Sequence, residues 1–205
     1  EYVASPLLWG IHVGTASKYE KIEDLKNAKV AISRMGSGSH LMACVHAEQQ
    51  GWDAQNLSFE IVHTIDGAVE ALTQGIADYF MWEHFMTKPL VDQGIFRHLG
   101  DCPTPWPCFV VAVREEFLQN HSSIISKTLC IINEQTLKFK SQPNLHVTLA
   151  EKYHQKPEDI LQWLSLTEWS QKNISHEVLN QVQNQLWALG LIDKKGTFAD
   201  IVASV

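Results

Sequence analysis

The first half of the chain shows two patterns of apolar and polar positions, one typical of strands and the other typical of helices. Short runs rich in β-branched and aromatic residues indicate strands, whereas longer stretches with apolar positions three and four apart indicate helices. The pattern predicts strands at residues 8–13, 29–33, 58–63 and 77–82. It predicts helices at residues 22–26, 39–50, 67–74 and 83–92. Strands and helices alternate from residue 29 onward, which implies an α/β fold with a parallel sheet and right-handed crossovers.

The pattern changes after residue 95. A short strand-like segment at 95–99 is followed by a proline-rich loop at 100–107, and then by an apolar run at 108–113 that predicts a buried strand. Beyond this run the chain predicts only helices, at 114–140, 144–154, 158–169 and 175–189. The first of these is expected to break near His121, and the last is expected to end at Gly190.

One turn has residue types that suit ligand binding. Residues 36–40, Gly-Ser-Gly-Ser-His, join the predicted strand at 29–33 to the helix at 39–50. The glycines permit a tight turn, and Ser37 or Ser39 can cap the helix. Backbone N–H groups and the positive end of the helix dipole would converge there, which suits an anion or a polar ligand head. The alternative is a capped turn without a ligand. A nucleotide P-loop is not expected, because the Gly-Lys-Ser/Thr ending is absent.

Composition and charge exclude several classes of partner. The chain has 205 residues, of which 45% are hydrophobic and 19% charged, which is ordinary for a globular protein with a sizeable core. The formal net charge of -7, with no cluster of lysine or arginine, argues against nucleic acid as a partner. No apolar run approaches the about 18–20 residues of a membrane span.

The four cysteines show neither a CxxC pair nor a metal-ligand spacing with histidine. Cys44 and Cys130 fall in apolar helical patterns and are expected to be buried free thiols. Cys102 and Cys108 flank the proline-rich loop, where they could pair in an oxidising compartment or stay reduced elsewhere. The histidines are scattered singly along the chain, so we expect no metal site and no cofactor.

Six short motifs, taken in order, resemble one family of substrate-binding proteins. They lie at residues 22–31, 36–40, 68–78, 82–83, 109–118 and 186–192. Residues 22–31, Ile-Glu-Asp-Leu-Lys-Asn-Ala-Lys-Val-Ala, are similar to the pattern I-x-D-L-K-G-K-x-I-A of that family. Each motif alone is weak, but their order over nearly the whole chain is specific. The chain resembles the type II periplasmic-binding-protein-like family, in its alkanesulfonate, taurine, nitrate and thiamine-precursor branch.

The resemblance implies two lobes and a mixed, mostly parallel α/β sheet with flanking helices. Residues 13–105 would form the complete second lobe. Residues 1–12 and 106–205 would supply the crossovers and the helical C-terminal part of the first lobe. Family members carry a further N-terminal segment that builds most of the first lobe. Nothing in this sequence matches that segment, so we expect the chain to be part of a longer protein.

The resemblance also implies that a ligand binds between the lobes, at the C-terminal ends of the strands. Ser37, Gly38 and Ser39, with the N–H groups that follow, would hold the acidic or polar head of the ligand. His40 could add a donor, which would be cationic if protonated; the alternative is a helix residue that faces solvent.

Further candidates for the cleft come from the tryptophans and two carboxylates. Trp82 would flank the cleft, and Glu83 would either accept from an amino group of the ligand or hold the lobes together. The alternative is a core tryptophan beside a solvated glutamate. Trp9 and Trp106, near the two crossovers, are candidate walls, and packing explains them equally well. Asp66, the expected cap of its helix, is a weaker candidate. Tryptophans beside an anion-binding turn favour a small aromatic or heterocyclic ligand with a polar end.

Three functions are open for such a chain. The first is a non-enzymatic, monomeric binding protein that delivers a small polar or anionic solute to an ABC transporter, in the periplasm or on a lipid anchor. The second is an enzyme like the thiamine pyrimidine precursor synthases, which use pyridoxal phosphate, iron and a cysteine-rich motif. This chain has only the separate Cys102 and Cys108 in the comparable region. The third is a cytoplasmic orphan binder without a transporter, which unpaired thiols would favour.

Overall fold

The computed structural model describes residues 1–203. The chain divides into two compact units and passes between them more than once. The sheet unit comprises residues 7–104 and 185–193, and the helical unit comprises residues 1–6 and 105–184 together with the segment from 194 onward. The lobe boundaries implied by the family resemblance stay a prediction.

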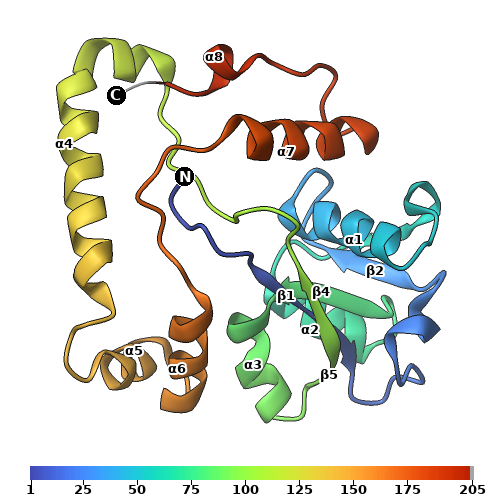
Figure 1. Cartoon of the computed structure of the whole chain (residues 1–205). Helices are drawn as coiled ribbons and strands as arrows, with labels where there is room; N and C mark the ends of the chain where they lie inside the picture. The colour runs from blue at the N-terminus through green and yellow to red at the C-terminus, as the bar shows by residue number, and fades with distance from the viewer. Residues whose placement is uncertain (204–205) are drawn as a thin grey trace. The chain divides into compact units, whose positions relative to one another are not determined.

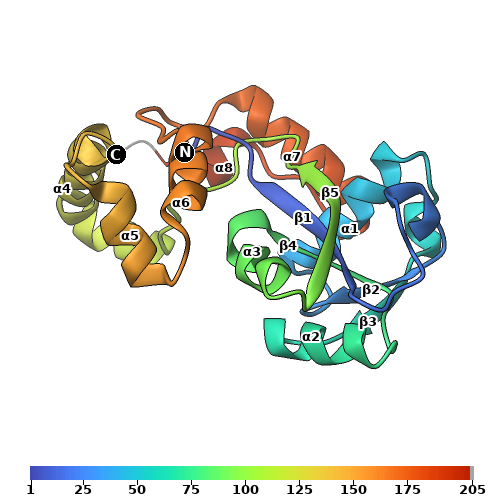
Figure 2. The ribbon, with the colours of Figure 1, turned by 90° about the horizontal axis from the view of Figure 1, so that it is seen from below.

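Five strands form the sheet, in the order β3-β2-β4-β1-β5 (Figures 1 and 2). Their bounds are β1 Leu8–Gly14, β2 Lys29–Ile32, β3 Ser58–Ile61, β4 Tyr79–Glu83 and β5 Phe96–Pro103. β2 pairs in parallel with β3 and with β4, while β1 lies antiparallel between β4 and β5. All strands except β1 therefore point the same way, which confirms the mixed, mostly parallel sheet.

Helices cover both faces of this sheet (Figure 2). Their bounds are α1 Gly38–Gln49, α2 Ile65–Thr73 and α3 His84–Asp92, with two short 3-10 helices, η1 Ile22–Leu25 and η2 Ala54–Asn56. On one face α2 and α3 bury Phe80 and Phe96 in a common apolar cluster. Tyr79 and Met81 alternate with Phe80 along β4, so they point to the opposite face, where α1 packs. The predicted order of strands and helices from residue 29 to residue 92 is confirmed.

The cap of α2 differs from the prediction. Thr64, not Asp66, is the N-cap, and its hydroxyl oxygen accepts from the N–H of Gly67 at 3.1 Å. Asp66 lies in the first turn of the helix, where its charge interacts favourably with the helix dipole. Threonine and aspartate are both residue types that cap helices, but the helix begins at Ile65, directly after the extended backbone of Thr64.

Two strand predictions after residue 95 need correction. β5 does not end at residue 99 but continues through Gly100 and Cys102 to Pro103, because β1 offers pairing partners as far as Leu8. The apolar run at 108–113 is not a buried strand: Phe109 makes one isolated bridge, to Val3, and Val110 is 57% exposed. A strand needs a neighbour for its N–H and C=O groups, and residues 110–113 have none among residues 1–203.

The helical unit is built around five helices. Their bounds are α4 Glu115–Phe139, α5 Leu145–Tyr153, α6 Pro157–Leu166, α7 His176–Ala188 and α8 Phe198–Ile201. The predicted break in α4 is confirmed, because His121 leaves the helical conformation with φ -137° and ψ 33°. Gly190 follows α7 with φ +66°, a conformation that favours glycine and so ends the helix. α8 was not predicted.

The cysteines are all free thiols. Cys44 and Cys102 are buried and Cys108 is half-buried, but Cys130 is exposed, so its predicted burial is wrong. The reason lies in α4, which has no buried residue along its whole length. No helix within residues 1–203 is both long enough and apolar enough to cross a membrane.

The N-cap of α2 can be tested by comparing two substitutions. Thr64→Ala should lower the free energy of unfolding by about 1 kcal/mol, because the N–H of Gly67 loses its acceptor. Asp66→Ala should be close to neutral, because alanine's higher helix propensity offsets the lost dipole interaction. Urea unfolding measures both. A larger loss for Asp66→Ala than for Thr64→Ala would contradict the assignment.

The buried His46 on α1 should make stability depend on pH. Neither ring nitrogen has a hydrogen-bond partner in the described structure, and burial lowers the pKa of His46 from 6.5 to about 4. Between these values the unfolded chain binds more protons than the folded chain, so the free energy of unfolding falls as the pH drops through this window.

We expect His46→Leu to reduce the loss of stability between neutral pH and about pH 5, measured by urea unfolding at both values. The exposed His63 supplies the control, and His63→Gln should keep the wild-type pH dependence. An unchanged pH dependence in His46→Leu would show that this histidine is not responsible.

Candidate functional site

The predicted Gly/Ser turn leads from the end of β2 into α1. Ser37 is the N-cap of α1, and its hydroxyl oxygen accepts from the N–H of His40 at 3.3 Å. Gly38 and Ser39 are the first residues of the helix, so their N–H groups have no acceptor one turn back. No other acceptor for these two N–H groups lies in the described part of the chain. Gly38 is exposed, so its N–H can meet a ligand.

The two serine hydroxyls hold the turn together. Ser39 Oγ accepts from the N–H of Ser33 at 2.9 Å and lies 3.0 Å from Ser37 Oγ. Both serines are buried. Because each hydroxyl is already engaged within the turn, the open N–H groups are the better donors for an anion.

His40 is buried and does not face solvent. Its Nδ1 accepts from the N–H of Gly36 at 3.1 Å, and its ring packs edge-on against Phe59. Burial lowers the pKa of His40, so the neutral ring is favoured over the cation. His40 therefore stabilises the turn through this hydrogen bond and this ring contact. A cationic donor at this position is disfavoured.

Trp9 and Trp82 come together beside the turn. The indole of Trp9 lies so close to Gly38 that a β-carbon there would be 3.1 Å from the ring. The rings of Trp9 and Trp82 meet edge-on with centroids 6.1 Å apart, and Trp82 stacks on Phe80. Trp9 Nε1 is buried without a hydrogen-bond partner in the described structure. The two strand ends and the start of α1 thus form one aromatic and polar surface.

Glu83 lies opposite Trp9 in the sheet, where the end of β4 pairs with the antiparallel β1. Its Oε2 accepts from the N–H of Met86 at 2.7 Å, so the side chain caps α3. Burial raises the pKa of Glu83, and hydrogen bonds from the backbone of α3 oppose that rise. Glu83 therefore has a structural task in addition to any contact with a ligand.

Within the sheet unit Asp66 is not brought to this surface, and Trp106 belongs to the helical unit. Asp66 is exposed in the first turn of α2, with no side-chain hydrogen bond or ion pair to Trp9, Trp82 or the turn. Trp106 is buried within the helical unit.

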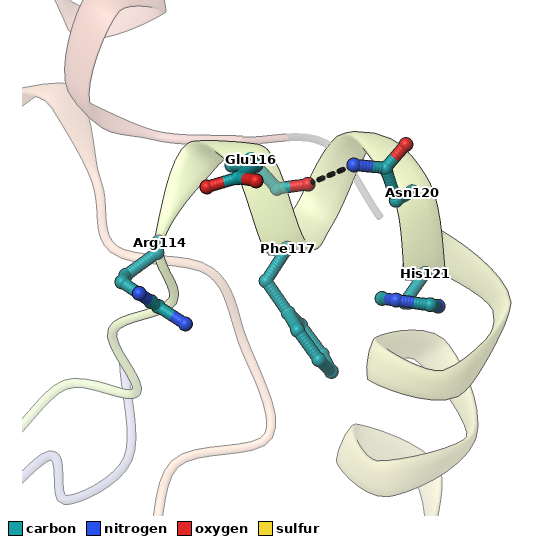
Figure 3. Close-up of a pocket in the computed structure, with 5 residues that line it drawn as sticks. All are labelled: Arg114, Glu116, Phe117, Asn120 and His121. Atoms are coloured by element: carbon teal, nitrogen blue, oxygen red, sulfur yellow. Dashed lines mark hydrogen bonds between the residues drawn. The ribbon is translucent and has the colours of Figure 1, made fainter.

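A small pocket lies in the helical unit, at the break in α4 (Figure 3). It encloses about 100 Å³ and is lined by Arg114, Glu116, Phe117, Asn120 and His121. Pockets for drug-sized ligands usually enclose about 300–1,000 Å³. The pocket is too small for such a ligand and contains none of the predicted site residues.

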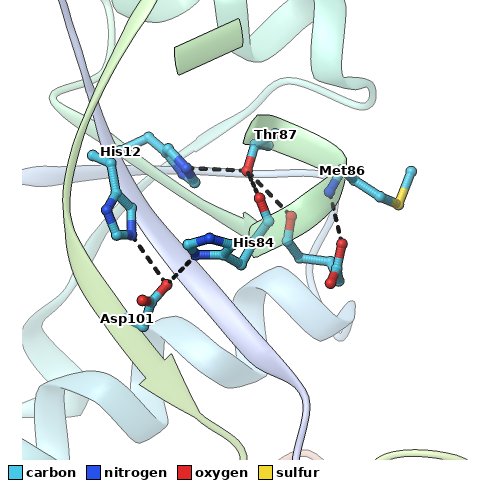
Figure 4. A network of polar contacts seen from close by, with 7 residues as sticks. His12, His84, Met86, Thr87 and Asp101 are labelled. Carbon is cyan, nitrogen blue, oxygen red and sulfur yellow. Dashed lines mark hydrogen bonds and ion pairs between the residues drawn. The ribbon is translucent and has the colours of Figure 1, made fainter. Parts of the chain in front are cut away.

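The fold creates one cluster that the sequence did not reveal. His84, His98 and Asp101 each place a ligand-type atom within 4.8 Å of the others (Figure 4). Burial by itself would raise the pKa of Asp101, but hydrogen bonds from the two histidines outweigh it and hold that pKa well below its usual range. No spacing rule signals the cluster, because His84 and Asp101 are 17 residues apart and meet only through the sheet.

Comparisons with known proteins agree with this architecture. A family model described as Ca3427-like PBP matches residues 9–102, the part of the chain that contains the sheet. The solved structure of the Candida albicans CA3427 gene product, described as having the generic periplasmic binding protein fold, aligns with a TM-score of 0.83 at 22% identity. The chain has a type II periplasmic-binding-protein fold. A search of curated proteins gives no significant match.

Two sulfonate-binding proteins share the same fold. The aliphatic sulphonate binding protein SsuA from Escherichia coli aligns with a TM-score of 0.69 at 20% identity, covering 99% of this chain and 69% of that one. The alkanesulfonate-binding protein SsuA from Xanthomonas axonopodis pv. citri, bound to MOPS, aligns with a TM-score of 0.72 at 15% identity, covering 97% and 72%. The match to the Candida protein covers 95% of this chain and 66% of that one, so the chain spans less than two thirds of its length.

The role of Ser39 in the turn can be tested by stability. Ser39→Ala should lower the free energy of unfolding by about 1–3 kcal/mol, because the N–H of Ser33 then loses its acceptor. The matched control is Ser58→Ala at an exposed strand position, which should change stability by less than about 0.5 kcal/mol. Urea unfolding measures both. Equal effects for the two substitutions would contradict the structural role of Ser39.

Proposed function

We propose that the chain binds a small organic anion at the surface formed by the first turn of α1, Trp9 and Trp82. The observation that carries this proposal is the contact of the Trp9 indole with Gly38, beside two backbone N–H groups without acceptors. An anionic head would accept from these N–H groups and be stabilised by the dipole of α1. The organic part would lie against the indole rings and exclude water.

The structural neighbours support the same class of ligand. Two of them are described as sulfonate-binding proteins, and one is bound to MOPS, a sulfonate with a protonatable amine. Glu83, opposite Trp9 in the sheet, could accept from an amino group of such a ligand. We therefore propose that alkanesulfonates and aminosulfonates are the first ligands to test.

The proposed biological role is that of the substrate-binding component of an ABC-type uptake system. The fold and the descriptions of its structural neighbours support this proposed role. Delivery to a permease requires no chemistry at the binding site. The hydrogen bonds and packing contacts around the turn would hold the ligand-binding groups in place.

Binding can be tested with two matched tryptophan substitutions. Isothermal titration with ethanesulfonate and with taurine, in a buffer free of sulfonates, should detect one site per chain. Trp9→Phe should weaken that binding by about tenfold, equivalent to about 1.4 kcal/mol, because the ring no longer spans from β1 to Gly38. Trp52→Phe should not change it, because Trp52 follows the other end of α1, about 18 Å along the helix.

Equal losses in the two variants would place the ligand elsewhere. Absence of binding for both ethanesulfonate and taurine would overturn the proposed ligand class.

A further inference from the structure

Asp101 of β5 joins two histidines from different elements in a compact cluster. Its Oδ1 lies 2.7 Å from Nδ1 of His84 and 3.0 Å from Nε2 of His98. The two imidazole nitrogens and the carboxylate oxygen lie within 4.8 Å of one another. Figure 4 shows the ring of His84 pointing toward the carboxylate of Asp101.

A β-bulge explains why His98 and Asp101 share a face of the sheet. Residues three apart on a regular strand point to opposite faces. Here the pairing of β1 with β5 shifts between Ile11, which faces Gly100, and His12, which faces His98. Leu99 is the extra residue of the bulge, and it restores the same orientation for residues 98 and 101. The bulge thus aims two donor groups at one point.

Gly10 explains how His84 reaches Asp101. β1 lies between β4 and β5, and Gly10 pairs with Trp82 on one side and with Asp101 on the other. A side chain at this position would stand between the two strands and would collide with the ring of His12, which is 2.5 Å from the β-carbon position. Because residue 10 has no side chain, His84 at the start of α3 can approach Asp101 across β1.

Contacts with neighbouring side chains limit the movement of the two histidines of the cluster. His12 packs its ring against His98 with centroids 5.5 Å apart, and its Nε2 lies 3.0 Å from Thr87 Oγ1. Thr87 also contacts the backbone carbonyls of Glu83 and His84 at 3.1 and 3.2 Å. The start of α3 is therefore tied to β1, which limits the movement of His84 relative to the sheet.

We propose that His84, His98 and Asp101 form a binding site for a divalent transition-metal ion, with Zn²⁺ as the ion that best matches the donors. Two imidazole nitrogens and one carboxylate oxygen are a common ligand set for Zn²⁺ with one position left for water. Ligand atoms around a tetrahedral Zn²⁺ are about 3.3–3.5 Å apart, given metal–ligand distances of about 2.0–2.2 Å. In such a site each histidine nitrogen would lie about 0.3–0.8 Å farther from Asp101 Oδ1 than the observed 2.7 and 3.0 Å.

Solvent can reach the three side chains. Their exposed fractions are 14% for His84, 27% for His98 and 30% for Asp101. Both imidazole nitrogens that face Asp101 Oδ1 are placed to donate to the carboxylate. When an ion binds, these nitrogens present lone pairs to it, and each neutral ring carries its hydrogen on the other nitrogen. The site lies outside the proposed solute-binding surface and does not depend on that proposal.

The test is a titration of the chelator-treated full chain with Zn²⁺ and with Co²⁺, in the absence of any organic anion. We expect one ion per chain by calorimetry, and visible absorption bands of the Co²⁺ form that Zn²⁺ displaces. His98→Gln and Asp101→Asn should each weaken Zn²⁺ binding by at least about tenfold, the lower limit found even for residues that only support a ligand.

Two control substitutions separate this site from other causes. His63→Gln removes an exposed histidine of the sheet unit and should leave the affinity unchanged. Trp9→Phe should also leave it unchanged, so a failure of solute binding would not be mistaken for a failure of the metal site.

Histidine side-chain NMR spectra of the wild-type chain keep the proposal testable if a variant misfolds. Zn²⁺ should shift the ring nitrogens of His84 and His98 before those of other histidines. Absence of one-to-one binding, or equal affinity in wild type, His98→Gln and Asp101→Asn, would overturn the proposal.

Discussion

The pairing of the antiparallel strand β1 with β4 on one side and β5 on the other holds the sheet unit together. Without β1, β5 would have no strand to pair with, because the other strands order as β3-β2-β4. β1 also distributes side chains to the two faces of the sheet. Trp9 turns toward the start of α1, whereas Gly10 and His12 lie on the face that α3 covers. The proposed solute surface and the proposed metal site thus depend on the same strand.

The turn before α1 separates groups that stabilise the fold from groups that are available to a ligand. The hydroxyls of Ser37 and Ser39 and the ring of His40 are buried and bonded within the turn. The N–H groups of Gly38 and Ser39 have no such partners. A rigid turn holds these donors in place before a ligand arrives, which lowers the entropy lost on binding. Unlike this turn, whose side chains are buried, α4 in the helical unit has no buried residue.

Much of the fold followed from the sequence because it depends on local patterns. Neighbouring residues set the alternation of strands and helices from residue 29, the break of α4 at His121 and the helix stop at Gly190. The predicted strand at 108–113 failed because an apolar run becomes a strand only beside a partner. The predicted cap of α2 was wrong because Thr64 and Asp66 both have side chains that can cap a helix, and the extended backbone that a cap requires is the one at Thr64.

The sequence by itself determined the fold class and the turn at residues 36–40, because residue types close in the chain specify both. Only the tertiary structure decided which distant side chains meet. Trp9 reaches Gly38 through the register of an antiparallel strand. The cluster at Asp101 depends on the bulge in β5 and on Gly10 in the neighbouring strand β1, which has no side chain. Such placements follow from strand order and register, which no spacing along the chain encodes.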